Sequence, residues 1–492
     1  MLYVGIDLGT SAVKLLLVDE AGAVVGQVSE SYPVAYPHPG WSEQSPADWW
    51  RAICAGVPRL LEGHDASQVR AIGVAGQMHG LVALDAAGGI IRPAILWNDG
   101  RTAEETRWLN EAVGTARLLD LTGNIAFAGF TAPKLLWMRA HEPEGFARIA
   151  HVLLPKDYVN WRLTGLFSSD PSDAAGTLLY DVGARAWSEP MCELCGVDPA
   201  WLPDVRESYE PVGEVLPNVA DDLGLPRGVV VCAGAGDNAA AAVGSGVVGA
   251  GSCNISLGTS GTVFIPTAGF SAGVGDQIHS FCHADGGWHL MGCILSAASC
   301  NGWWATDVLG TTDLAGEQAG IEAAAVGAQD PYFVPYLMGE RTPWNDPAAR
   351  GCFVGLRMDT GRRDMTRAVL EGVAFALRDS VEIARGLGAD VRRSRVCGGG
   401  AQSALWLQMI ANVLDVTLEL PATEQGPGYG GAILGAVAAG DFASVADAAA
   451  GLVRVRATVA PDPAAVAAED ARYQVWRGLY PALRETFAAM AG

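Results

Sequence analysis

Two short segments with nearly the same residues lie half a chain apart, and their chemistry suits phosphate binding. Residues 7–11 read Asp-Leu-Gly-Thr-Ser, and residues 256–261 read Ser-Leu-Gly-Thr-Ser-Gly. Each lies between two apolar runs, so each is predicted to be the turn of a β-hairpin. A glycine there can take a positive φ, and the backbone N–H groups with the hydroxyls form a small anion-binding concavity. The pair predicts a phosphate chain held between two related halves.

Asp7 stands at the end of the first predicted strand, directly beside this turn. A carboxylate in that place repels a phosphate unless a divalent cation lies between the two, so Asp7 is a candidate Mg²⁺ ligand, direct or through water. The alternative is an aspartate that caps the turn. The second hairpin favours the metal role, because it strengthens the case for a bound phosphate.

Asp237 follows an apolar run and opens a predicted helix over 238–243. An aspartate at a helix N-terminus is common and has a structural explanation as a cap. The functional alternative is a general base that accepts the proton of a substrate hydroxyl during phosphoryl transfer. These residues alone do not rank the two explanations.

Two polar segments also follow predicted strands: residues 76–80 (Gly-Gln-Met-His-Gly) and residues 96–101 (Leu-Trp-Asn-Asp-Gly-Arg). Ligands of α/β domains usually bind where the strands end. A single histidine is more often an ordinary packing partner than a ligand contact. Among polar neighbours such as Gln77, Asn98 and Asp99, however, His79 is a candidate for hydrogen bonds to sugar hydroxyls.

Glycines mark three further places. Residues 398–403 (Gly-Gly-Gly-Ala-Gln-Ser) lie between a predicted strand and a predicted helix, where a nucleotide can approach the backbone; a tight turn is the alternative. The G-x-G-x-x-G matches at 244–249 and 426–431 lack the context of a dinucleotide fingerprint, and are predicted to be hinge and backbone-approach positions. A P-loop is excluded, because none of the three lysines follows a glycine.

The length of 492 residues predicts two domains rather than one core. The repeated hairpin places their boundary between residues 246 and 247, which gives domains over 1–246 and 247–492. Strands are expected over 13–19 and 23–28, and helices over 46–61 and 363–385. A strand, glycine loop and helix over 395–414 indicate mixed or parallel sheets covered by helices.

Composition excludes several classes of protein. A formal net charge of −22 argues against nucleic-acid binding, which needs clustered Lys and Arg. The longest apolar run, 229–248, contains Asp237 and many glycines, so no membrane span is expected. No signal peptide is predicted, and the cytoplasm is the expected compartment. The ten cysteines are scattered, and the Cys192/Cys195 pair is predicted to be structural or incidental.

Taken together, these motifs resemble those of the FGGY carbohydrate kinases. The resemblance extends to about residue 440 and includes supporting segments such as Phe-Thr-Ala-Pro-Lys at 130–134 and Gly-Glu-Arg-Thr-Pro at 339–343. It implies an α/β fold of two ribonuclease-H-like domains, of the actin and hexokinase type, with the active site in the cleft between them. The N-terminal domain would carry the sugar site and the catalytic base, and the C-terminal domain would bind the nucleotide.

The same resemblance implies roles for individual residues. Asp237 is expected to be the catalytic base and Asp7 the carboxylate on the metal side, with both near Mg²⁺. The expected sugar contacts are Gln77, Met78, His79, Asn98, Asp99 and Asn238. The expected ATP contacts are Gly9, Thr10, Ser11 and Lys14 in the first hairpin, Gly258, Thr259 and Ser260 in the second, and Gly399, Gly400 and Gln402 near the adenosine.

The leading expectation is an ATP- and Mg²⁺-dependent kinase that converts D-xylulose to D-xylulose 5-phosphate. Glycerol kinases carry a loop resembling Gln-Arg-Glu where this chain has Gln77-Met78-His79, which argues against glycerol. The alternatives are an FGGY kinase for another ketose or polyol, and an actin-like ATPase without a sugar substrate. A small ketose and ATP are the expected partners, and a homodimer is left open.

Overall fold

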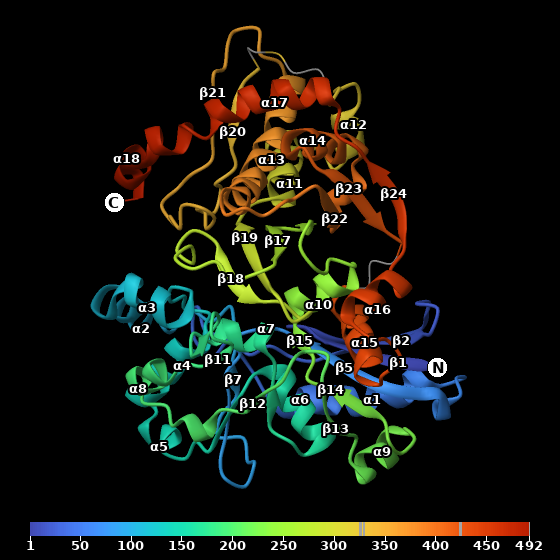
Figure 1. Ribbon diagram of the computed structural model, residues 1–492. Helices are drawn as coiled ribbons and strands as arrows, with labels where there is room; N and C mark the ends of the chain where they lie inside the picture. Colours follow the sequence, from blue (N-terminus) through green and yellow to red (C-terminus); the bar gives the residue numbers. More distant parts are fainter. Residues whose placement is uncertain (324–326, 328–329, 423–425, 492) are drawn as a thin grey trace.

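The computed structural model describes residues 1–323, 327, 330–422 and 426–491. Two seven-stranded sheets, each with helices packed against it, form two domains that lie one above the other in Figure 1. Among the described residues, no helix has the length and apolar character needed to cross a membrane.

The first sheet has the strand order β13-β14-β5-β1-β2-β3, and β15 pairs with the end of β5. Strands β1, β2 and β3 are antiparallel neighbours, whereas β5 runs parallel to β1, and β14 runs parallel to β5. The bounds are β1 (Leu2–Leu8), β2 (Ala12–Asp19), β3 (Val24–Ser31), β5 (Val69–Gly76), β13 (Pro211–Glu214), β14 (Val230–Cys232) and β15 (Ala235–Gly236).

The second sheet has the order β18-β19-β17-β16-β22-β23-β24 and repeats this pattern. Its hairpin β16–β17 is antiparallel, β19 pairs antiparallel with β17, and β22 and β23 run parallel to β16. The bounds are β16 (Ser252–Leu257), β17 (Gly261–Thr267), β18 (His279–Cys282), β19 (Trp288–Ile294), β22 (Arg393–Cys397), β23 (Thr417–Pro421) and β24 (Val455–Val459). Three antiparallel strands followed by parallel ones confirm the expected ribonuclease-H-like fold in both halves.

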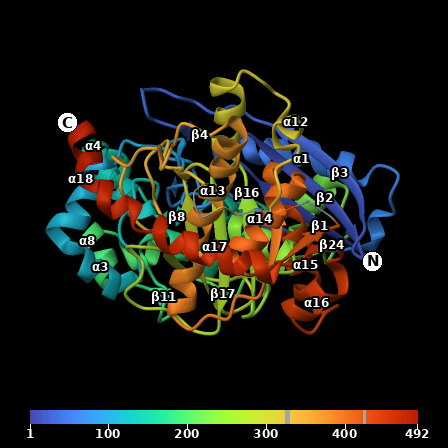
Figure 2. The same ribbon diagram turned by 90° about the horizontal axis from the view of Figure 1, so that it is seen from above.

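Helices bury the apolar side chains of both sheets. On the first sheet, the even residues of β1 face α1 (Pro46–Leu61) and α6 (Pro155–Thr164), in a core that includes Trp49 and Tyr158. On the second sheet, α13 (Arg362–Gly386) and α14 (Ala404–Leu414) provide most of the helical cover. Helices α17 (Pro463–Trp476) and α18 (Leu479–Ala491) extend across the outer side of this domain (Figure 2).

The remaining described α-helices have 4 to 13 residues, and the remaining strands have two or three. The helices are α2 (Ala103–Arg107), α3 (Thr115–Thr122), α4 (Thr131–His141), α5 (Pro143–Phe146), α7 (Pro171–Ala174), α8 (Glu189–Cys195), α9 (Pro217–Leu223), α10 (Asp237–Gly244), α11 (Ala298–Trp303), α12 (Leu314–Gln318), α15 (Gly426–Ala438) and α16 (Val445–Leu452). The strands are β4 (Glu43–Gln44), β6 (Val82–Leu84), β7 (Ala94–Ile95), β8 (His151–Leu153), β9 (Ser168–Ser169), β10 (Tyr180–Asp181), β11 (Ala186–Trp187), β12 (Asp204–Val205), β20 (Tyr332–Val334) and β21 (Cys352–Val354).

Helix α15 comes late in the chain but packs on the first sheet, beside β1 and β5 (Figure 1). Glycines make this contact close: a Cβ on Gly5 would lie 1.9 Å from the carbonyl oxygen of Gly428, and one on Gly73 would lie 1.9 Å from that of Gly431. On its other side α15 meets α10, where a Cβ on Gly430 would lie 1.8 Å from the Ala240 carbonyl oxygen. The backbone-approach positions predicted from the glycine pattern at 426–431 are confirmed.

The predicted division at 246/247 stays a prediction, and in space part of the C-terminal half packs on the sheet of the N-terminal half. Residues 426–452, on the C-terminal side of that boundary, pack against the first sheet. The Tyr3 hydroxyl and the Arg70 guanidinium both donate to the Asp441 carboxylate, and the Tyr429 hydroxyl donates to the Gly22 carbonyl. Helices α15 and α16 therefore complete the core of the first domain.

Candidate active site

Three strands of the first sheet end side by side, and their ends carry the predicted catalytic residues. In the parallel pairing, Asp7 of β1 lies beside Ala75 of β5, which in turn lies beside Ala235 of β15. The chain then continues from β5 into Gln77 and from β15 into Asp237. Residues separated by more than 200 positions in the sequence thus meet at one sheet edge, where ligands of α/β domains bind.

Asp7 and Asp237 influence each other electrostatically. Burial raises the pKa of Asp237 to about 7, and the negative charge of Asp7 contributes to the rise. Burial also raises the pKa of Asp7 to about 6, and the nearby Lys14 opposes that shift. A carboxyl with a pKa near neutrality can accept a proton at physiological pH and release it again.

Asp237 begins α10, as the sequence predicts. Its Oδ1 accepts a hydrogen bond of 3.1 Å from the Asn238 side-chain amide, which also lies 3.7 Å from the Met78 sulfur. The chain N-terminal to Asp237 is fixed as well, because the Gly236 amide donates to the Ser172 hydroxyl oxygen. One continuous surface at the end of β15 is therefore formed by Asp237, Asn238 and Met78.

His79 is held in a defined orientation and protonation state. Its Nδ1 lies 2.8 Å from the Gly176 carbonyl oxygen, to which only a protonated Nδ1 can donate, so the neutral ring presents an unprotonated Nε2. Burial, followed by the charge of Lys134, lowers the pKa of His79 to about 3. The ring lies 4.7 Å from that of Phe130. His79 can thus accept a hydrogen bond from a hydroxyl through Nε2.

The backbone of His79 takes a left-handed conformation, with φ of 68°, that is uncommon for a residue other than glycine. Its carbonyl accepts hydrogen bonds from the Lys134 ammonium, at 2.7 Å, and from the Thr131 hydroxyl, at 3.1 Å. Both residues begin α4, and the Lys134 side chain is fully buried. Lys134 was missed as a site residue by the sequence analysis, although its segment was among the resembling motifs.

Gln77 and Thr10 belong to a hydrogen-bonded network beneath the first hairpin. The Thr10 hydroxyl donates to Gln77 Oε1 and accepts from the indole N–H of Trp97, at 3.2 Å and 3.0 Å. The Gln44 amide donates to the Thr10 carbonyl, and the Gln77 amide donates to Gln44. The Thr10 hydroxyl is thus already engaged, which leaves the exposed Ser11 and the backbone N–H groups of the first hairpin to contact phosphate.

The two predicted sugar contacts in the 96–101 segment have different surroundings. Asn98 is exposed, next to Trp97, which reaches the first hairpin. Asp99 is buried, and its carboxylate accepts from the Ser42 amide and from the Arg101 guanidinium. Arg101 in turn packs 3.7 Å from the centre of the Trp41 ring. Asp99 is therefore engaged in holding this loop together.

The second hairpin is held by its backbone and leaves its hydroxyls exposed. The Thr259 carbonyl accepts from the Ala297 amide and the Ser299 hydroxyl, and the Gly258 carbonyl accepts from the Ala298 amide. The side chains of Thr259 and Ser260 are exposed. Their hydroxyls are placed where an anion can bind without displacing a protein hydrogen bond.

A cavity of about 310 Å³ lies in the second domain beside the glycine loop. It is lined by the predicted residues Gly399, Gly400 and Gln402, and by Asn301 of α11 and Gln318 of α12. Gly398, just before it, has φ of 91°, and a Cβ there would lie 2.7 Å from the Leu257 carbonyl oxygen. The loop thus packs against the end of the second hairpin, which joins the phosphate and adenosine regions. Asn301 and Gln318 gave no signal in the sequence.

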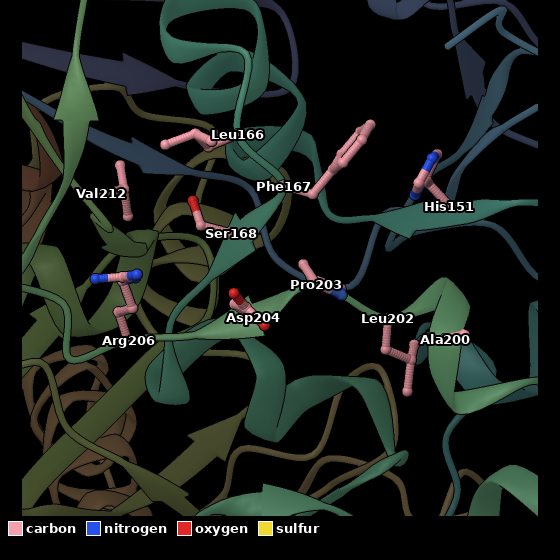
Figure 3. A pocket seen from close by; sticks show the side chains of 10 residues that line it. All are labelled: His151, Leu166, Phe167, Ser168, Ala200, Leu202, Pro203, Asp204, Arg206 and Val212. Carbon is pink, nitrogen blue, oxygen red and sulfur yellow. The ribbon is translucent and has the colours of Figure 1, made fainter. Parts of the chain in front are cut away.

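Another cavity, of about 320 Å³, lies in the first domain away from these residues (Figure 3). His151, Phe167 and Ser168 line one side, and Leu202, Pro203, Asp204 and Arg206 line the other. None of the predicted catalytic, sugar or nucleotide contacts borders it, so we assign it no part in the chemistry.

The carboxylates fit Mg²⁺ bound together with a nucleotide. Mg²⁺ is commonly held by one or two carboxylates with substrate phosphates and water, rather than by a complete cage of side chains. Among the described residues, no group of three or more His, Cys, Asp or Glu side chains forms such a cage. Asp7 is a partly buried carboxyl at the predicted phosphate site, and its chemistry suits this shared mode of binding.

Comparisons with known proteins agree with this geometry. The model of the "FGGY family of carbohydrate kinases, N-terminal domain" matches residues 2–244, and that of the C-terminal domain matches residues 253–439. The chain is 44% identical to the xylulose kinase of Escherichia coli K12 over 484 residues, 98% of this chain and 99% of that protein. It is 36% identical to the xylulose kinase of Bacillus subtilis, over 99% of this chain and 98% of that protein. The crystal structure of the xylulose kinase from Rhodospirillum rubrum superposes with a TM-score of 0.92 at 30% identity, over 99% of this chain and 100% of that one.

Proposed function

Because the chain belongs to the FGGY family of carbohydrate kinases, we propose that it transfers the γ-phosphate of ATP to D-xylulose and forms D-xylulose 5-phosphate. The substrate follows from the full-length similarity to xylulose kinases. The observation that carries the mechanism is the meeting of Asp7, the Gln77–His79 loop and Asp237 at one sheet edge.

In the proposed reaction, Asp237 accepts the proton of the attacking sugar hydroxyl while the bond to the γ-phosphorus forms. A pKa of about 7 leaves a large fraction of Asp237 ionised at neutral pH, and the Asn238 amide orients its carboxylate. Met78 forms a wall against the sugar, and His79 accepts a hydrogen bond from a sugar hydroxyl through Nε2. Asp7 would hold Mg²⁺, which neutralises phosphate charge when bound.

The nucleotide is proposed to span both domains. The exposed Thr259 and Ser260 would contact its phosphates from the second hairpin, and backbone N–H groups of the first hairpin would contact them from the other side. Its adenosine would occupy the cavity beside Gly399 and Gly400. Transfer then requires both domains to close on the two substrates, which also excludes water.

A coupled assay of ADP release with D-xylulose, L-ribulose, glycerol and no sugar tests this proposal. We expect D-xylulose to give the highest kcat/KM, glycerol to be nearly inert, and ADP release without sugar to be negligible. An ATPase independent of sugar would contradict the proposal, and a preference for L-ribulose would leave a kinase with a different substrate.

Asp237→Asn tests the proposed base. We expect kcat to fall by roughly two to four orders of magnitude with ATP binding retained, because the amide cannot accept the proton. The matched control is Asp221→Asn, which changes an exposed aspartate that pairs with Arg227 on the surface. Near-normal turnover in Asp237→Asn would reduce that residue to a helix cap.

A further inference from the structure

Arg341 is presented rigidly by its neighbours in the second domain. Glu340 accepts hydrogen bonds from the backbone amides of Leu295 and Arg341, at 2.9 Å and 2.7 Å. On the other side, Thr342 pairs with Cys293 through its backbone amide and its hydroxyl, each at 3.0 Å. The backbone at Arg341 is therefore tied to the end of β19 on both sides.

The guanidinium of Arg341 points across the domain interface. Its central carbon lies 5.3 Å from the ring centre of Phe127, a residue of the first domain. Phe127 and Arg341 also border the same small cavity, together with His279 of β18. The Phe127 ring lies 5.3 Å from that of Phe130, which lies 4.7 Å from that of His79, so these contacts connect Arg341 to the proposed sugar site. The charge of Arg341 also contributes to the lowered pKa values of His79 and His279.

Within the part of the chain that the structure describes, no carboxylate or carbonyl oxygen forms an ion pair or hydrogen bond with the Arg341 guanidinium. Of the titratable groups near it, His79 and His279 have lowered pKa values, and Asp276 borders the same small cavity. Burial raises the pKa of Glu340 to about 8, and the charge of Arg341 opposes that rise. Glu340 directs its accepting oxygen to backbone amides. The half-buried Arg341 guanidinium has five N–H donors and one aromatic contact, so its donors are able to bind a ligand.

The order of the site residues indicates which part of a sugar would meet Arg341. Asp237 and Asn238 lie at one end, Met78 contacts Asn238, and His79 follows Met78 toward Phe130 and the domain interface. If the 5-hydroxyl reacts at Asp237, the carbon chain of a ketopentose runs along Met78 toward His79. Its C1 hydroxyl and C2 carbonyl then lie at the end nearest Arg341.

We propose that Arg341 is a specificity-determining residue that donates hydrogen bonds to the oxygens at the non-reacting end of the ketose, the C1 hydroxyl above all. This inference rests on the proposed function and extends it to a residue of the second domain. The first domain carries the base and His79, so a contact from Arg341 links recognition of the sugar to closure of the two domains. A sugar lacking the C1 hydroxyl loses this link.

The test is a cycle of two substrates and several variants. The kcat and KM are measured for D-xylulose and for 1-deoxy-D-xylulose with the wild type, Arg341→Met and Arg341→Lys. Methionine keeps most of the side-chain length but has no donors, whereas lysine restores a charged donor. Arg357→Met, which removes an exposed arginine paired with Asp359, is the matched control.

We expect Arg341→Met to lower kcat/KM for D-xylulose by about 10- to 100-fold, chiefly through KM, and for the deoxy sugar by less than about threefold. Lysine should recover part of the loss, and the KM for ATP and the thermal midpoint should stay close to those of the wild type. An equal loss on both sugars, or none on D-xylulose, overturns the role of Arg341. A wild-type enzyme that does not phosphorylate D-xylulose overturns the proposed function itself, which separates the two failures.

Discussion

The two glycine hairpins share a sequence pattern but differ in what they offer a ligand. In the first, between β1 and β2, the Thr10 hydroxyl is bonded to Gln77 and Trp97, and the strand supplies the carboxylate of Asp7. In the second, between β16 and β17, Ser256 stands where Asp7 stands, and the hydroxyls of Thr259 and Ser260 are exposed. Ser11 is exposed as Ser260 is, so the two copies differ at the threonine and at the strand end: the first has an engaged Thr10 and a carboxylate beside the base, and the second has an exposed Thr259 and no carboxylate there.

The largest expected effect separates the two equivalent positions, Asp7 and Ser256. Asp7→Asn should lower kcat by roughly two to three orders of magnitude, because the phosphate charge loses the carboxylate that we propose holds Mg²⁺. Ser256→Ala should change kcat by less than about threefold. Steady-state rates measured over a range of Mg²⁺ concentrations check both. Equal losses in the two variants would contradict this difference between the two strand ends.

The pH dependence of kcat/KM sharpens the same comparison. Asp237 acts as a base only when ionised, and its pKa is raised to about 7, so kcat/KM should fall about tenfold per unit as the pH drops below 7. Because the negative charge of Asp7 contributes to that rise, Asp7→Asn should shift the acid limb to lower pH. Ser256→Ala should leave it in place. If the wild type, Asp7→Asn and Ser256→Ala share the same acid limb, the charge of Asp7 does not affect the pKa of Asp237.

A smaller effect distinguishes the two threonines. Thr259→Val should raise the KM for ATP by about tenfold with little change in stability, because among the described residues no group forms a hydrogen bond with the hydroxyl that it removes. Thr10→Val should do the reverse: the urea midpoint falls by the equivalent of about 1 kcal/mol, since Gln77 loses a donor, and the KM for ATP changes less. Titration of both variants with ATP and with urea tests the pair. A higher KM from Thr10→Val than from Thr259→Val would reverse the assignment.

Much of the fold could be predicted from local patterns. The hairpin strands, the helix over Pro46–Leu61, and the strand, glycine loop and helix near 395–414 all appear at or close to the expected residues. These elements are specified by apolar periodicity, by proline at a helix start and by glycine at turns, all of which are local in the sequence. The predicted polar ends of β1, β5 and β15 also meet, because the carboxyl ends of parallel strands share one edge. The 96–101 segment instead follows β7, which pairs antiparallel with β4 in a separate sheet.

The rest of the site depends on contacts that no local pattern encodes. Nothing near Lys134 indicates that its ammonium binds the His79 carbonyl, and nothing near Asp99 indicates that Arg101 and Ser42 occupy its oxygens. Asn301 and Gln318 line the nucleotide cavity only because α11 and α12 fold over the glycine loop. Such contacts arise from tertiary packing, and the spacing of residues in one sequence does not specify their partners.

Helix α15 determines when the first domain can finish folding. Its glycines pack against Gly5 and Gly73, Tyr429 donates to the Gly22 carbonyl between β2 and β3, and Asp441 accepts from Tyr3 of β1. When the first 246 residues have been translated, the face of the first sheet that α15 covers is therefore still exposed to water. That face stays open until residues 426–452 emerge, after the whole second sheet except β24 has been synthesised. One face of the N-terminal sheet thus lacks its helical cover for most of the time that the chain is being translated.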